Sequence, residues 1–320
     1  MWCVIRFGIC TQEQYLRLGE SARCTVWWIS YSLLDVGEHP TEEQMRLFED
    51  ISFSLRFSNN TFRTTFRRRF QDVDSLAMRW IGRFYPAETE LHVEDRAASH
   101  ALTSWEWAES LFQIFPHAVF EASDILFELI ELSLPGGGKY IVEPDGTPLQ
   151  YVKPPFVTTV HHLPPWRYPI NRLMGLRARR RFRSLALPKG WMDTSRVGEC
   201  RVRRIPYIHP EALAFSRKNP RFRFRVQSVF ERTPGCCHVL RTMNIFNRHY
   251  FPPDQLVEGA RAAFDSLHPG GIWIVGRSLE EDFSNHATIF ARREKSWEVL
   301  ERIGQGSEME DLALHAPMAG

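Results

Sequence analysis

The sequence predicts an α/β fold built on a mainly parallel β-sheet with helices on both faces. The segment 244–278 predicts it most clearly, because Pro252-Pro253 opens a helix and Pro269-Gly270-Gly271 ends it. The continuous apolar run 272–276 that follows is typical of a strand covered on both faces. Together with the apolar run 238–240 ahead of the segment, these elements predict a βαβ unit.

Ligands of such sheets bind beyond the carboxyl ends of the strands. Function is therefore expected at 241–247, after the first strand of this unit, and at 277–281, after the second.

Residues 1–88 are predicted to form a mainly helical N-terminal region. Thr41-Glu42-Glu43 opens one periodic stretch, and the apolar spacing of 76–84 marks another. Between them, 62–70 interleaves arginines with phenylalanines, a pattern that fits either nucleic-acid stacking or an amphipathic helix with solvated arginines. Residues 1–40 show no clear pattern.

From residue 89 strands and helices alternate. A strand is expected at 91–94, a helix begins at Thr103 with Glu106 completing a capping box, and a second strand at 118–124 ends in Asp124. A further helix is expected at 125–134.

An insertion is expected at about 136–200. It would hold a β-hairpin, with strands at 139–143 and 148–152 around an Asp-Gly turn, and a basic helix at about 171–187. Five arginines of this helix could bind an anionic partner, either RNA, an acidic protein or a membrane surface, or could form a solvated face: Arg177, Arg179, Arg180, Arg181 and Arg183.

The sheet is then expected to resume with a strand at 203–208, a helix at 210–218 and a strand at 222–226. Two more strands, at 286–291 and 297–303, would form an antiparallel end. The expected organisation is thus an α/β domain over 89–312 and a tail over 313–320.

Composition narrows the class of protein. With 320 residues and 43% apolar content the chain can bury a large core, and its net charge is only +2. Its six cysteines show no regular framework, which favours a reducing compartment. No membrane span or signal peptide is predicted, so a cytoplasmic location is expected. Cys236-Cys237-His238 is interpreted as a loop-to-strand junction, and no metal site is predicted.

The stretch "VLRTMNIFNRHYF" at 239–251, followed by a helix and by "LHPGG" at 267–271, resembles class I S-adenosylmethionine-dependent methyltransferases. In detail it is similar to the catalytic domain of the chemotaxis-receptor methyltransferases. The resemblance implies a Rossmann-like class I methyltransferase sheet flanked by helices, with an N-terminal helical extension and an insertion of a β-hairpin and a basic helix.

The resemblance also implies where S-adenosylmethionine would bind. The family's glycine-rich loop is matched by "VEDRAASHALTSWEWAESL" at 93–111, which has no glycine, with Ala97, Ala98 and Ser99 as its small residues and Ala101 where a glycine is expected. Asp124 matches the acidic residue for the ribose, although it could instead cap a following helix.

Two further positions complete the implied site. Gln227-Ser228 stands at the tip of the third strand, where Ser228 is the candidate, and Asn244 follows the fourth strand. Asn244 could equally be a turn residue that bonds to its own backbone.

No catalytic residue is assigned by these patterns, and Asn244, His249 and Tyr250 are the candidates. The expected function is methyl transfer from S-adenosylmethionine to an unknown substrate. The alternative is a methyltransferase-like protein without catalysis that binds an anionic partner through its basic insertion.

Overall fold

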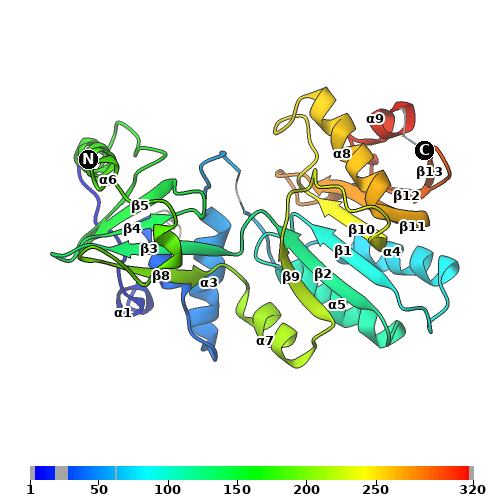
Figure 1. Cartoon of the computed structure of the whole chain (residues 1–320), viewed down its shortest axis with the longest axis horizontal. Coiled ribbons are helices and arrows are strands. Elements are labelled where there is room, and N and C mark those ends of the chain that lie inside the picture. Colours follow the sequence, from blue (N-terminus) through cyan, green and yellow to red (C-terminus); the bar gives the residue numbers. More distant parts are fainter. Residues whose placement is uncertain (1–3, 19–27, 62, 317–320) are drawn as a thin grey trace. The chain divides into compact units, whose positions relative to one another are not determined.

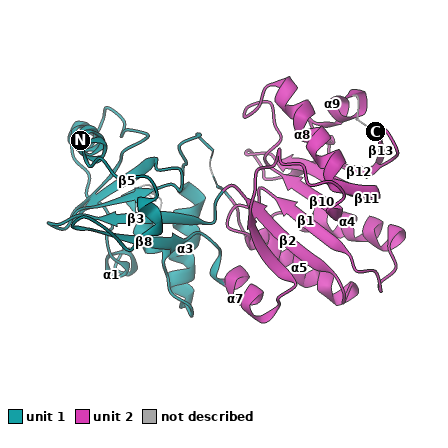
Figure 2. Cartoon of the chain, viewed as in Figure 1, with its two compact units in different colours: residues 1–64, 126–210 teal, residues 65–125, 211–320 magenta. Residues whose placement is uncertain are grey.

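The computed structural model describes residues 4–18, 28–61 and 63–316. The chain divides into two compact units, each made of two segments (Figure 2). Unit 1 comprises residues 1–64 and 126–210, and unit 2 comprises residues 65–125 and 211–320. No helix of the described residues is long and apolar enough to cross a membrane.

Unit 2 is built on a seven-stranded sheet in the order β13-β12-β11-β10-β1-β2-β9 (Figure 1). The five strands from β9 to β11 are parallel, and β12 and β13 form an antiparallel end, as predicted. The strands are β1 (His92–Arg96), β2 (Val119–Asp124), β9 (Phe222–Val226), β10 (Cys237–Met243), β11 (Leu267–Ser278), β12 (Asn285–Arg292) and β13 (Trp297–Ile303).

Helices cover both faces of this sheet. Leu240 of β10 belongs to an apolar core with residues of α8, whereas the next residue, Arg241, contacts Asp74 of α4 and Trp107 of α5. Because successive strand residues point to opposite faces, α8 lies on one face and α4 and α5 on the other. The helices of this unit are α4 (Gln71–Phe84), α5 (Leu102–Ile114), α8 (Pro253–Ser266) and α9 (Glu310–His315), with α7 (Pro210–Lys218) starting at the boundary.

The parallel strands follow the doubly wound order 3-2-1-4-5, so the predicted Rossmann-like fold is confirmed. The chain leaves β1 toward β2 and β9 on one side, and β10 and β11 continue on the other. The direction of winding therefore reverses between β1 and β10. Ligands of such sheets bind beyond the carboxyl ends of the strands at this reversal.

Unit 1 contains a six-stranded sheet in the order β6-β5-β4-β3-β8-β7, in which every pair is antiparallel. Its strands are β3 (Glu128–Ser133), β4 (Lys139–Val142), β5 (Pro148–Lys153), β6 (Phe156–Thr159), β7 (Arg196–Val197) and β8 (Cys200–Pro206). Its helices are α1 (Gln12–Leu16), η2 (Tyr31–Leu34), α3 (Glu42–Ser54), α6 (Pro169–Ser184) and η3 (Trp191–Asp193).

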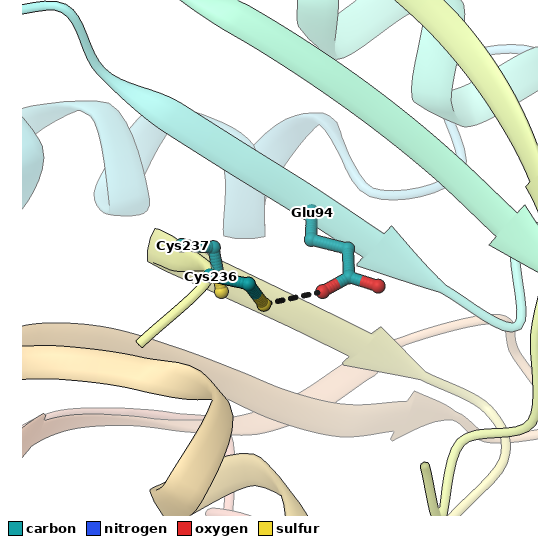
Figure 3. Close-up of side chains that lie close together, drawn as sticks. All are labelled: Glu94, Cys236 and Cys237. Atoms are coloured by element: carbon teal, nitrogen blue, oxygen red, sulfur yellow. Dashed lines mark hydrogen bonds between the residues drawn. The ribbon is translucent and has the colours of Figure 1, made fainter. Parts of the chain in front are cut away.

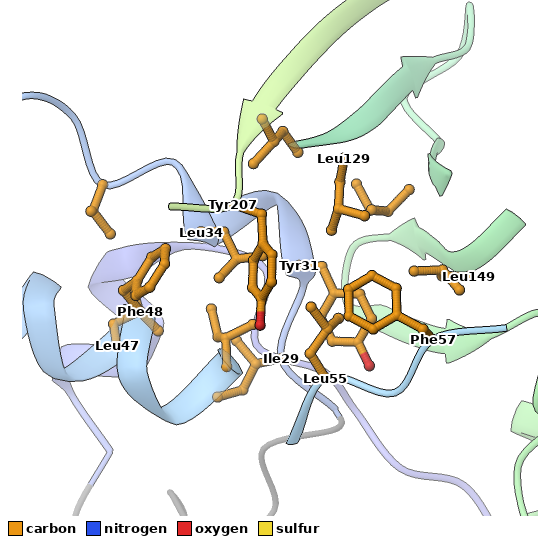
Figure 4. Close-up of a cluster of buried hydrophobic side chains, with 14 of the residues drawn as sticks. Ile29, Tyr31, Leu34, Leu47, Phe48, Leu55, Phe57, Leu129, Leu149 and Tyr207 are labelled. Atoms are coloured by element: carbon orange, nitrogen blue, oxygen red, sulfur yellow. The ribbon is translucent and has the colours of Figure 1, made fainter. Parts of the chain in front are cut away.

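Each face of the unit 1 sheet is covered by its own apolar cluster. Leu129 and Ile141 pack with residues of η2 and α3 (Figure 4), whereas Ile130 and Tyr140 pack with residues of α6. Neighbouring residues of one strand thus enter different cores, as the two-residue period of a strand requires.

Several predicted elements are confirmed. The hairpin of β4 and β5 forms around the predicted turn, and the basic helix is α6. The βαβ unit of β10, α8 and β11 and the strands β2 and β9 form as predicted, but α8 ends at Ser266 and Pro269-Gly270-Gly271 lies inside β11.

Other predictions were wrong. The segment 125–134 was predicted as a helix but forms β3, because its apolar run is buried on both faces of a sheet and carries no helical period. The strand predicted at 203–208 is β8, which pairs with β3 and so does not resume the parallel sheet. The capping box at Thr103 and Glu106 is absent, since α5 begins after Ala101 without a side-chain cap.

The division of the chain also differs from the expected organisation. The segment inserted into the parallel-sheet unit covers 126–210, whereas the sequence suggested an insertion at 136–200. Residues 1–64 belong to the same unit as this inserted segment. The pairing of β3 with β8 joins the two ends of this inserted segment, which lie about 70 residues apart in sequence.

Two leucines of unit 1 should differ in how much their replacement by alanine lowers the free energy of unfolding. Leu129 is fully buried, whereas Leu173 on α6 is 49% exposed. Leu129→Ala should lower the free energy of unfolding by about 2–5 kcal/mol, because it removes buried apolar surface and leaves a cavity. Leu173→Ala should change it by less than about 0.5 kcal/mol. Urea denaturation of both variants measures this, and equal effects would contradict the described core.

Candidate functional site

The loop between β1 and α5 has an unusual backbone. Ala97, Ser99 and Ala101 have φ angles of 61°, 57° and 63°, all in the left-handed region. Glycine adopts this conformation readily, whereas other residues lose about 1–2 kcal/mol in it. The loop therefore has the backbone of a glycine-rich turn, with left-handed residues at every second position, although its sequence has no glycine.

Hydrogen bonds to β2 hold this loop. The backbone N–H of Ala98 donates to the carbonyl oxygen of Ser123 at 3.0 Å, and that of Ser99 donates to the Asp124 carboxylate at 2.8 Å. Asp124 is 2% exposed. It does not cap a helix, because the next element along the chain is the strand β3. The carboxylate at the tip of β2 thus fixes the tip of β1.

Two buried polar groups next to this loop have no hydrogen-bond partner among the described residues. They are the Ser99 hydroxyl and the side-chain amide of Gln227, whose oxygen and nitrogen are both unpaired. Gln227 follows β9, is 4% exposed, and its backbone N–H donates to the Asp124 carbonyl oxygen at 2.8 Å. A buried unpaired amide costs about 1–3 kcal/mol, so a polar ligand that paired with it would recover this energy.

At the tip of β9 the buried residue is Gln227, whereas the sequence suggested its neighbour Ser228. Ser228 is exposed, and its hydroxyl accepts a hydrogen bond from the Phe230 N–H at 3.3 Å. Asp124 connects the tips of β1, β2 and β9. Its carboxylate accepts a hydrogen bond from the Ser99 N–H, and its carbonyl oxygen accepts one from the Gln227 N–H.

A buried ion pair lies beneath the loop, on the face that α4 and α5 cover. The Arg241 guanidinium donates to the Asp95 carboxylate at 2.9 and 2.6 Å and to Asp74 at 2.5 Å. It also lies 4.5 Å from the ring centroid of Trp107. Burial raises the pKa of Asp74 to about 7, with Arg241 acting in the opposite direction.

The predicted catalytic candidates follow β10. The Asn244 side chain accepts a hydrogen bond from the Ser278 N–H at 2.7 Å and so joins the tips of β10 and β11. His249 and Tyr250 are exposed, and their backbone N–H groups donate to the Asn247 side chain at 3.0 and 3.1 Å.

A pocket of about 400 Å³ is lined by residues of β13, α9 and the segment between them, together with Arg248. Arg248, Arg302 and Glu308 are among its lining residues, and none of the predicted cofactor residues lines it. Arg302 pairs with Glu310, and Glu308 pairs with Arg277, so its charged groups largely neutralise one another.

Sequence reasoning missed the pairing of Asp95 with Arg241. The signal was present, because Glu94-Asp95-Arg96 places three charges in a strand that should be buried. It also passed over Gln227 in favour of its neighbour, because burial at a strand tip cannot be read from the pattern.

No protein-family model and no curated protein matches the sequence. Among solved structures, the chain is similar to the citrinin polyketide synthase CMeT domain at 10% identity and a TM-score of 0.37, covering 84% of this chain and 48% of that one. It is also similar to an O-methyltransferase family protein from Burkholderia thailandensis, at 11% identity and a TM-score of 0.31, covering 75% and 43%.

A third similar structure is the S-adenosylmethionine-dependent methyltransferase SibL, at 13% identity and a TM-score of 0.28, covering 67% of this chain and 37% of that one. The chain thus spans less than half the length of each of these three proteins. The assignment of the fold rests on the strand order of unit 2 and not on these similarities.

Replacement of serine by glycine should change the free energy of unfolding in opposite directions at Ser99, in the left-handed loop, and at Ser110, in α5. Ser99→Gly should raise the free energy of unfolding by about 1 kcal/mol, because it relieves the backbone and removes a buried unpaired hydroxyl. Ser110→Gly, at an exposed position within α5, should lower it by about 0.5 kcal/mol. Chemical denaturation compares the two, and a loss of stability in both would show that the loop backbone is not strained.

Proposed function

We propose that the protein is an S-adenosylmethionine-dependent methyltransferase whose cofactor lies at the tips of β1, β2 and β9. One observation carries the proposal most directly: the buried amide of Gln227 lacks a partner beside a loop with the backbone of a glycine-rich turn. Buried polar groups are mostly hydrogen-bonded in folded proteins, and a bound ligand is one way to satisfy an unpaired one.

Each residue of the loop region would have a separate task. The small side chains of Ala97 and Ala98 would let the cofactor approach the turn, at the start of α5 where the helix dipole is positive. Asp124 would accept hydrogen bonds from the ribose hydroxyls, since each carboxylate oxygen can accept more than one. The Gln227 amide would donate to and accept from the edge of the adenine.

The cofactor, when bound, supplies a methyl group on a sulfonium centre that is open to attack by a nucleophile. The protein's contribution would be to align the substrate nucleophile with that carbon. His249 and Tyr250 follow β10 and are exposed, so they are the candidates to accept a proton from an oxygen or nitrogen nucleophile. A carboxylate substrate would need no such base.

Calorimetric titration with S-adenosylmethionine and S-adenosylhomocysteine tests the proposal. Micromolar binding is expected for the wild-type protein, at least tenfold weaker binding for Gln227→Ala, and loss of binding for Asp124→Ala. Ser228→Ala is the matched control at the neighbouring exposed position and should bind as the wild type does. The absence of heat from both ligands with folded wild-type protein would refute a working cofactor site.

We propose as a second function that α6 docks unit 1 on an anionic membrane surface. Its arginines 177, 180, 181 and 183 are exposed, whereas the guanidinium of Arg179 is held by the carbonyl oxygens of Val160 and His161. The same helix exposes three large apolar residues: Ile170 at 40%, Leu173 at 49% and Leu176 at 36%.

More apolar surface adjoins the first turns of α6. Trp166, just before the helix, is 77% exposed. The segment from Val4 to Phe7 adjoins the helix, with the Ile170 N–H donating to the Val4 carbonyl oxygen. Val4 and Phe7 are 51% and 62% exposed. Basic residues beside exposed apolar ones, with a tryptophan among them, suit a lipid headgroup and acyl boundary.

Sedimentation with phosphatidylserine-containing vesicles measures this second function. Arg177→Glu combined with Arg180→Glu should weaken binding by at least tenfold, because each basic residue near an anionic surface contributes about 1 kcal/mol. Arg46→Glu, at an exposed position on α3, is the control and should have a smaller effect. Binding to RNA without binding to anionic vesicles would show that the partner is a nucleic acid, and binding to neither would refute the docking surface.

A further inference from the structure

Glu94, Cys236 and Cys237 form a cluster on the face of the parallel sheet that α8 covers (Figure 3). Glu94 lies on β1, Cys237 is the first residue of β10, and Cys236 belongs to the preceding loop. The carboxylate oxygen and the two sulfur atoms lie within 4.8 Å of one another. Glu94 and Cys237 are buried and Cys236 is partly exposed, so the cluster has one side open to solvent.

The spacing of these atoms matches a metal centre. The Cys236 sulfur lies 3.6 Å from the Glu94 oxygen. With zinc–sulfur and zinc–oxygen bonds of about 2.3 and 2.0 Å, a tetrahedral site places the sulfur and oxygen ligands about 3.5 Å apart. The Ser266 carbonyl oxygen, which is 3.6 Å from the Cys237 sulfur, stands near a fourth position that water could also take.

The charge of the cluster also fits a divalent cation. Arg96 donates to both carboxylate oxygens of Glu94, at 3.0 and 2.9 Å, so the pair is already neutral. A divalent ion that replaced the two thiol protons would bring two positive charges to two thiolates. The net charge of this buried region would then stay at zero, which avoids the energy of burying an unbalanced charge.

An ion can reach these ligands, because Cys236 is the more accessible of the two thiols. Solvent reaches the cluster from the side of Cys236, which provides a path of entry for an ion.

We propose that Cys236, Cys237 and Glu94 bind a thiophilic divalent cation of the Zn²⁺ class. Binding converts two thiols to thiolates, forms two metal–sulfur bonds and releases two protons to solvent. The ion would join β1 to the start of β10 and so stabilise the centre of the sheet. The sequence did not predict this site, because adjacent cysteines chelate poorly alone and the third ligand lies 142 residues away.

His238 does not belong to the cluster. Its Nδ1 atom accepts a hydrogen bond from the His92 N–H at 3.1 Å, and as the residue after Cys237 it points to the other face of the strand.

Titration of the purified, reduced protein with Cd²⁺ tests the site, with the ultraviolet thiolate-to-metal absorption as the signal. One equivalent should bind tightly with release of about two protons, and competition with a chromophoric chelator should give the corresponding Zn²⁺ affinity. Cys236→Ser, the partly exposed position, should weaken binding by at least a hundredfold, and Cys237→Ser should do the same.

Cys10→Ser and Cys200→Ser are the matched controls, since both remove free thiols outside the cluster. A variant with Cys3 and Cys24 changed to serine tests the remaining thiols in the same way. These controls should bind as the wild type does. Failure of the folded wild-type protein to bind one equivalent of Cd²⁺, or unchanged affinity in Cys236→Ser, would overturn the proposal.

Discussion

The architecture of unit 2 depends on neutralising three adjacent charges inside its central strand. Glu94, Asp95 and Arg96 of β1 are all at most 3% exposed. Glu94 pairs with Arg96 on one face, and Asp95 pairs with Arg241 of β10 on the other. Loss of one partner would leave a buried uncompensated charge, which destabilises a protein by about 3–5 kcal/mol. The register of β1 against β10 is thereby fixed at the point where the sheet reverses its winding.

The position of the loop that follows β1 is set by this strand. The loop is held by the backbone of β2 through Ala98 and by the Asp124 carboxylate through Ser99, and Asp124 also fixes the chain after β9 through its carbonyl oxygen. Three strand tips are thus connected by one residue. Strained backbone of this kind persists where the surrounding structure determines it, which is common at binding sites. The proposed cofactor site therefore depends on the buried ion pairs that hold β1 in place.

The sequence predicted the elements of the parallel sheet because local signals mark them: prolines at the start of α8, and apolar runs at β10 and β11. It mistook β3 for a helix, since a short apolar run has no distinctive period when both faces are buried. The burial of Gln227 beside the predicted Ser228 could not be read from the pattern, because it depends on the packing of the strand tip. The contact of Glu94 with two cysteines distant in sequence could not be predicted, because it depends on tertiary structure alone.

A cofactor bound at the strand tips of β1, β2 and β9 would protect their backbone from solvent. Hydrogen–deuterium exchange with and without excess S-adenosylhomocysteine shows this, because the readout reports where the ligand acts. We expect slower exchange in peptides that cover 97–105 and 226–230, with the peptides of unit 1 unchanged. Unchanged exchange at both strand-tip segments, or protection confined to other regions, would contradict the proposed cofactor site.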